Sequence, residues 1–338
     1  MTAAPTRLAL LFTLLSALAV HAAPPSVRTL TLGAYTTPRE AYGKAIIPAF
    51  QRDWKQKTGQ DVRFQESYLG SGAQARAIAG GFEADVAALS LEADVDTLAK
   101  AGLIQRDWRA GPNRGMVSRS IVVIAVRQGN PKGVRDWDDL RRKGLEVLTP
   151  NVRTSGGAKW NVCALYGAAL RGGTGAKQGD AGGASALLAD VLRNVTVMDK
   201  GARESMINFE KGVGDVAITY ENEVLVGRKS GETYEYVVPK ATILIENPAA
   251  VVDKYADKHG NRDLAEAFVA FLATPEAQRA FAEYGLRPVD PGVAKETVKR
   301  FPAVRDLFGI RDLGGWAQVE KTLFAPDGAY ERAMAAAR

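Results

Sequence analysis

Short apolar segments alternate with amphipathic ones along most of this 338-residue chain. Residues 29–35 alternate apolar and polar positions and predict a first strand, and the apolar spacing after Pro38 predicts a helix that ends at Gly59. Two further strand–helix pairs follow, over residues 61–81 and 84–103. Strands and helices that alternate at such short intervals predict an α/β fold built on mainly parallel sheets.

The second half of the chain repeats this pattern around a different core. Residues 119–128 are almost continuously apolar and predict a buried strand. A chain of this length is expected to form two domains of about 150 residues each. We therefore expect two lobes, one from residues 27–115 and 241–338 and the other from residues 116–240. The chain would cross between them twice and leave a cleft at the carboxyl ends of the strands.

The N-terminus carries an export signal. Arg7 precedes an apolar run from Leu8 to Val20, which is shorter than the roughly 20 residues of a membrane-spanning helix. Small residues follow this run, so we expect a signal peptide at residues 1–22 that is cleaved after Ala22. An uncleaved anchor is the alternative. Export without a lipid-modified cysteine predicts a periplasmic protein.

Charge and residue usage exclude several functional classes. Removing residues 1–22 lowers the formal net charge from +6 to +5, and basic residues are interleaved with acidic ones, which argues against nucleic-acid binding. Cys163 is the only cysteine and lies in an apolar helical stretch, so we expect it in the core. Without the signal peptide His259 is the one histidine, too few for a multi-histidine zinc site. We therefore predict a protein that is no enzyme and needs no cofactor.

Three turns place small residues where a predicted strand ends and a helix begins. They are residues 69–73 (LGSGA), 154–158 (TSGGA) and 201–203 (GAR). A helix start leaves backbone N–H groups without partners and is electropositive, so such a turn binds an oxyanion without a charged side chain. Ser71 and Ser155 add hydroxyl donors. One such turn is more often explained by helix capping alone, whereas three in one chain make anion binding as good an explanation as capping.

The chain resembles the periplasmic sulfate-binding proteins of sulfate/thiosulfate ABC importers over nearly all of its mature length. The segments that carry the resemblance are AYTTPREAY, LGSGAQA, EADVAALSLEADVD, VRQGNPKGVRDWDDL, TPNVRTSGGAKWN, DKGAR and GVGDVAITYENE. The resemblance implies a two-lobed type II periplasmic binding protein fold, each lobe a mainly parallel sheet flanked by helices. It also implies a dianion held by neutral donors in the cleft and a membrane permease as partner. We expect the protein to be a monomer.

The resemblance also implies which residues contact the ligand. Carried over position by position, they are Thr36, Ser71, Ser155, Gly156, Gly157, Ala202 and Tyr220. Two positions depart from the family. Thr36-Thr37-Pro38 stands where sulfate binders often have Asp-Pro, and Tyr220 replaces a tryptophan whose indole N–H contacts the ligand. Thiosulfate-preferring relatives also lack that tryptophan, so the preference between the two anions stays open.

Hydrogen-bond chemistry separates sulfate from phosphate. Sulfate has no proton near neutral pH and suits a site made of donors, whereas hydrogen phosphate would need an acceptor, and an unmatched polar contact costs about 1–3 kcal/mol. Glu204 and Glu221 are the carboxylates near the predicted turns, and we expect both to pair with protein groups such as Arg203. The sequence predicts a sulfate receptor. A thiosulfate, molybdate or phosphate receptor is the alternative, and a periplasmic sulfatase or phosphatase is the alternative of another class.

Overall fold

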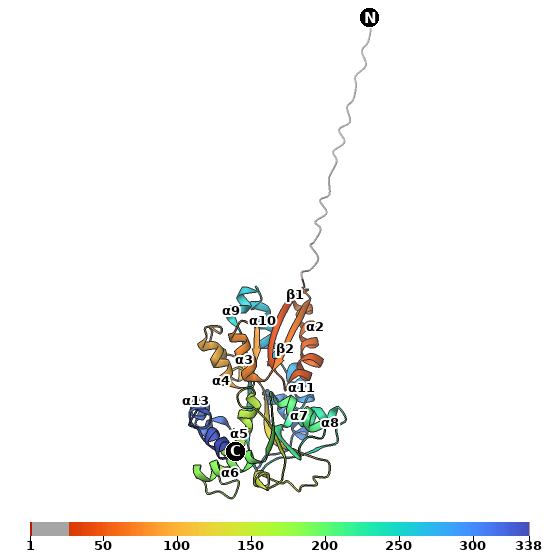
Figure 1. Cartoon of the computed structure of the whole chain (residues 1–338). Coiled ribbons are helices and arrows are strands. Elements are labelled where there is room, and N and C mark those ends of the chain that lie inside the picture. Colours follow the sequence, from red (N-terminus) through yellow and green to blue (C-terminus); the bar gives the residue numbers. More distant parts are fainter. Residues whose placement is uncertain (2–26, 338) are drawn as a thin grey trace.

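A computed structural model describes Met1 and residues 27–337, and it has two lobes joined by one continuous mixed sheet (Figure 1). The strand order is β2-β1-β3-β9-β4-β7-β5-β6, with β10 added to β9 and β8 added to β4. The predicted two-lobed α/β fold is confirmed. The predicted signal peptide lies, apart from Met1, outside the described residues. Within residues 27–337 no helix is long and apolar enough to cross a membrane.

The strands are short in both lobes and longest between them. They are β1 (Arg28–Tyr35), β2 (Val62–Leu69), β3 (Val86–Ala88), β4 (Met116–Val126), β5 (Val147–Pro150), β6 (Val195–Asp199), β7 (Val216–Tyr220), β8 (Glu235–Val237), β9 (Ala241–Val251) and β10 (Asp306–Phe308). Parallel pairs join β1 to β2 and β3 in one lobe, and β5 to β6 and β7 in the other. Each lobe therefore has a parallel sheet of its own.

Helices connect the strands and cover the sheets. They are α1 (Arg39–Ala41), α2 (Ile47–Thr58), α3 (Ser71–Ala79), α4 (Glu92–Lys100), α5 (Gly156–Leu170), α6 (Ala181–Arg193), α7 (Ala202–Glu210), α8 (Glu221–Lys229), α9 (Asp253–Lys258), α10 (Arg262–Leu272), α11 (Pro275–Glu283), α12 (Pro291–Thr297), α13 (Gly315–Val319) and α14 (Ala329–Ala337). Gly59 ends α2 in the left-handed region at φ 73°, as the sequence predicted.

The two long strands β4 and β9 tie the lobes together. They pair antiparallel around the midpoint of the molecule, from Met116 opposite Pro248 to Ile121 opposite Leu244. Beyond that point β4 continues into the second lobe, where it pairs with β7, while the far end of β9 pairs with β3 of the first lobe. These two strands, here called the hinge strands, therefore belong to both lobes.

The C-terminal segment lies on the second lobe, so its predicted place in the first lobe is wrong. Trp316 is buried in the second core, where its ring meets that of Trp160 at 4.7 Å between centroids. Helix α14 packs against α6, and β10 pairs with the first residues of β9. The chain thus crosses between the lobes a third time, between α12 and β10. Apolar side chains of the tail, such as Leu323 and Ala333, are buried in the same core as those of α5 and α6.

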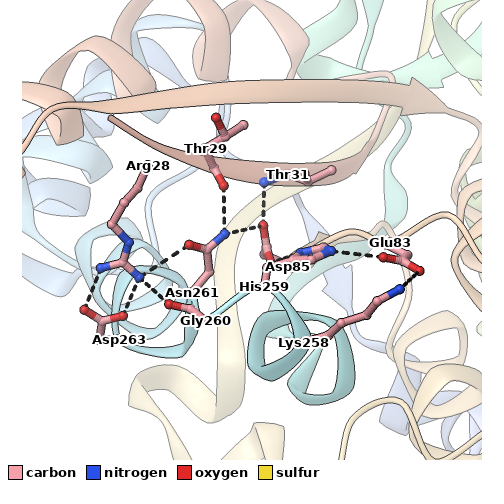
Figure 2. Close-up of polar contacts among 10 residues, drawn as sticks. All are labelled: Arg28, Thr29, Thr31, Glu83, Asp85, Lys258, His259, Gly260, Asn261 and Asp263. Atoms are coloured by element: carbon pink, nitrogen blue, oxygen red, sulfur yellow. Dashed lines mark hydrogen bonds and ion pairs between the residues drawn. The ribbon is translucent and has the colours of Figure 1, made fainter. Parts of the chain in front are cut away.

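A polar cluster fastens α9 and α10 to the first sheet (Figure 2). The fully buried carboxylate of Asp85 accepts hydrogen bonds from the N–H of Thr31 at 2.7 Å and from Asn261 at 3.2 Å. His259 contacts the same carboxylate through Nδ1 at 2.8 Å and Glu83 through Nε2 at 3.0 Å. His259 is therefore part of a structural cluster that includes no residue of the three predicted turns.

Candidate anion-binding site

The three predicted turns meet where the lobes touch. Helix α3 of the first lobe begins at Gly70-Ser71, and the N–H of Ala73 donates to the carbonyl of Thr154 in the second lobe at 3.2 Å. A Cβ atom on Gly70 would lie 2.5 Å from the carbonyl oxygen of Thr154 and 2.8 Å from that of Lys200. Only glycine permits this approach. The starts of α3, α5 and α7 therefore converge across the lobe boundary.

Helix α5 contributes backbone N–H donors from its first turn. Ser155 is its N-cap and accepts from the N–H of Ala158 at 3.4 Å. The N–H groups of Gly156 and Gly157 lie in the first turn of the helix. No helical carbonyl precedes them by four residues, so they have no partner within the helix. The helix is 15 residues long, and its dipole makes this end electropositive. This end of α5 is suited to hold an anion.

Tyr220 and Ala202 lie directly beside the start of α5. A Cβ atom on Gly157 would lie 2.7 Å from Cε2 of Tyr220 and 3.2 Å from the Cβ of Ala202. Tyr220 ends β7 and is buried, and Ala202 is the first residue of α7. The structure thus brings Gly156, Gly157, Ala202 and Tyr220 together.

Ser71 is buried in the same region, but its hydroxyl is already engaged. Its Oγ donates to Asp94 at 2.5 Å and accepts from the N–H of Ser90 at 2.9 Å. Burial raises the pKa of the Asp94 carboxyl, and the hydrogen bond from Ser71 opposes that rise. With the hydroxyl hydrogen directed to Asp94, the backbone N–H at the start of α3 is the donor that Ser71 offers.

Thr36 faces the start of α7 from the other lobe. A Cβ atom on Gly201 would lie 3.4 Å from Oγ1 of Thr36 and would collide with Oε2 of Glu204. That oxygen of Glu204 is buried and has no hydrogen-bond partner among the described residues. Glu221, by contrast, forms a bidentate ion pair with Arg287 at 2.6 and 2.9 Å. The prediction that both carboxylates pair with protein groups is therefore correct for Glu221 and wrong for Glu204.

The cation in the first turn of α7, Arg203, is balanced by carboxylates from both lobes. Arg203 lies 2.7 Å from Glu40 of α1 and 3.1 Å from Glu223 of α8. Burial raises the pKa of Glu223 to about 7, although Arg203 lowers it. The positive field at the site therefore comes mainly from neutral N–H groups and helix ends.

Two nearby tyrosines and the single cysteine are not part of this cluster. Tyr35 is buried with its ring 6.3 Å from that of Tyr220, whereas the hydroxyl of Tyr68 donates to Glu66 at 2.6 Å, beneath Arg39. Cys163 is fully buried in the second core, and burial raises the pKa of its thiol. Its placement suits a core side chain.

Sequence reasoning missed Ser90. This serine follows β3 and is fully buried, and its Oγ lies 2.6 Å from the hydroxyl of Tyr220 in the other lobe. Its place just beyond the carboxyl end of a parallel strand was the available signal, because α/β sheets bind ligands there. A single serine within the apolar run ALSL did not stand out from a strand.

Comparisons with known proteins identify the family of the chain. The family described as bacterial extracellular solute-binding protein matches residues 30–287. A sulfate-binding protein from Synechococcus elongatus is 44% identical over 309 residues, covering 91% of this chain and 87% of the relative. A thiosulfate-binding protein from Pseudomonas aeruginosa is 36% identical and covers 93% of each chain. The structure of the sulfate-binding protein SubI from Mycobacterium tuberculosis superimposes with a TM-score of 0.80 at 38% identity, over 87% of this chain and 98% of that one.

Proposed function

Because this chain belongs to the bacterial extracellular solute-binding proteins, we propose that it is a receptor that captures sulfate between its two lobes. The observation that supports this function best is the convergence of three helix starts across the lobe boundary, where Gly70 lies against the carbonyls of Thr154 and Lys200. Helix starts stabilise an anion through N–H groups and the helix dipole. The family is one of solute-binding proteins and not of enzymes.

The proposed contacts are the groups predicted from the sequence. They are the N–H groups of Thr36, Ser71, Gly156, Gly157 and Ala202 and the hydroxyls of Ser155 and Tyr220. All are neutral donors, which suits an anion without a proton. Hydrogen phosphate would leave its own O–H facing a donor, and a buried mismatch of this kind costs about 1–3 kcal/mol. The expected selectivity is therefore sulfate over phosphate.

Thiosulfate is the second candidate. The family resemblance implies a tryptophan in sulfate binders at the position of Tyr220, and a relative that covers 93% of this chain is named a thiosulfate-binding protein. Thiosulfate is also a tetrahedral dianion without a proton at neutral pH. The same donors would therefore hold it, and the difference would lie in the space left for one sulfur atom.

The cellular role follows from the same proposal. We expect a periplasmic monomer, exported with residues 1–22 as a cleavable signal peptide. After closing on its anion, it would deliver the anion to the membrane permease of an ABC importer, which supplies the ATP hydrolysis. The contacts between lobes, such as Arg203 with Glu40, suit a protein that presents a closed surface when loaded.

Calorimetry on anion-free protein tests the function directly. The protein is unfolded, dialysed free of anions, refolded and titrated with sulfate, thiosulfate, molybdate and phosphate near neutral pH. We expect tight one-to-one binding of sulfate and no heat from phosphate, because every proposed contact is a hydrogen-bond donor and none accepts the phosphate proton.

Two results would contradict the proposal. Phosphate binding as tight as sulfate binding would mean that an acceptor such as Glu204 faces the anion, and the sulfate assignment would be wrong. Turnover of aryl sulfate or aryl phosphate by the same preparation would place the chain among hydrolases.

A further inference from the structure

Ser90 forms hydrogen bonds with both lobes and with the hinge strand β9. Its N–H donates to Ser71 of its own lobe at 2.9 Å. Its carbonyl accepts from Nε1 of Trp160 in the second lobe and from Asn247 of β9, both at 3.1 Å. Its hydroxyl meets the hydroxyl of Tyr220 at 2.6 Å. Every polar group of Ser90 is thus engaged, and most of its partners lie beyond its own lobe.

The contact between the two hydroxyls uses only one of their two hydrogens. Each hydroxyl carries one hydrogen, and a single hydrogen bond joins them, so the second hydrogen remains to be donated elsewhere. Both side chains are fully buried, where an unused O–H is unfavourable. Burial also raises the pKa of the Tyr220 phenol, so this group stays a donor at neutral pH.

The hydroxyl pair lies over the start of α5. A Cβ atom on Gly156 would be 2.7 Å from Oγ of Ser90, and one on Gly157 would be 2.7 Å from the ring of Tyr220. The spare hydrogen therefore lies beside the N–H groups proposed to hold the anion. Resting on the proposed function, we propose that Ser90 and Tyr220 act as one unit that donates a single hydrogen bond to the bound anion and does so only when the lobes are closed.

The position of the two residues links this donor to closure. Ser90 belongs to the first lobe and Tyr220 to the second, so opening the lobes breaks the 2.6 Å contact. The open form meets the anion without the pair, and the closed form retains the anion with it. Loss of either hydroxyl should therefore speed dissociation and leave association nearly unchanged.

The test compares Ser90→Ala, Tyr220→Phe and the double variant with the parent chain, by calorimetry and stopped-flow kinetics with sulfate and thiosulfate. Tyr255→Phe is the matched control, because this buried tyrosine donates to the carbonyl of Ile78 within the first lobe. Each single variant should lose about 10- to 100-fold in affinity, as for one hydrogen bond to a charged group. The double variant should lose no more than either single one.

The outcomes separate this inference from the function on which it rests. Tight binding by the parent with unchanged affinity in Ser90→Ala and Tyr220→Phe would overturn the inference alone. Losses that multiply in the double variant would mean two independent hydroxyls and would also overturn it. A parent chain that binds neither anion would overturn the proposed function, and the inference with it. Tyr220→Phe keeps the ring and its packing, so it remains informative if Ser90→Ala folds poorly.

Discussion

At the scale of single residues, the absence of a side chain at Gly156 lets the lobes come together. A Cβ atom there would lie 2.7 Å from Oγ and 2.8 Å from Cβ of Ser90, which belongs to the opposite lobe. Gly156→Ala should therefore oppose closure without disturbing either lobe. Overpacking of this kind costs about 1–3 kcal/mol, which predicts a roughly 5- to 150-fold loss of sulfate affinity by calorimetry.

Gly43→Ala is the control for that change. A Cβ atom on Gly43 would meet only Oε2 of Glu66, at an ordinary 3.7 Å, so its affinity should equal that of the parent. Unaltered affinity in Gly156→Ala would show that the lobes bind sulfate in a more open arrangement than the one described.

Some residues of the site were predictable and others were not, for physical reasons. Small residues at a helix start form a local sequence pattern. Gly156, Gly157 and Ala202 were therefore predicted as site residues, and they lie together. The engagement of the Ser71 hydroxyl by Asp94 depends on a helix that begins about 20 residues later. Ser90 depends on a partner 130 residues away. No local pattern carries such pairings.

At the scale of elements, the cluster around His259 makes the docking of α9 and α10 sensitive to pH. Burial lowers the pKa of His259, but the hydrogen bonds with Asp85 and Glu83 outweigh burial, so its pKa is raised from the usual 6.5. The charged form is therefore favoured in the folded protein. Its stabilisation is complete below about pH 6.5 and is lost as the pH rises through the raised pKa.

His259→Gln should remove this pH dependence. The parent should lose free energy of unfolding, by about 1 kcal/mol or less for such partly exposed pairs, as the pH rises from about 6 to 8. Urea denaturation at a series of pH values measures both proteins. The difference between them should be largest at the acidic end, and parallel curves would show that His259 does not contribute.

Strands and helices were easier to predict than their neighbours in space. The first strand was expected at residues 29–35 and spans Arg28–Tyr35, because alternation of apolar positions fixes a strand locally. The C-terminal tail contains the helices α13 and α14. Its lobe was predicted wrongly, since an amphipathic helix specifies an apolar face and does not specify which surface covers it.

At the scale of the whole molecule, the C-terminal segment is expected to stabilise the second lobe alone. Trp316 and Trp54 are each 7% exposed and lie in different cores. Removing a buried aromatic side chain costs about 3–5 kcal/mol. Hydrogen exchange read by mass spectrometry should therefore show faster exchange in α5 and α6 for Trp316→Ala, and in α10 for Trp54→Ala. Loosening of α10 by Trp316→Ala would contradict this division.

The third crossing of the chain has a practical consequence. Strand β1 starts at Arg28 on one lobe, and α14 ends at Ala337 on the other (Figure 1). A donor dye attached near Arg28 and an acceptor dye attached near Ala337 would therefore lie on different lobes. Energy transfer between the dyes would then follow each opening and closing event in real time. A chain labelled in this way would report anion binding optically, with no label inserted into either core.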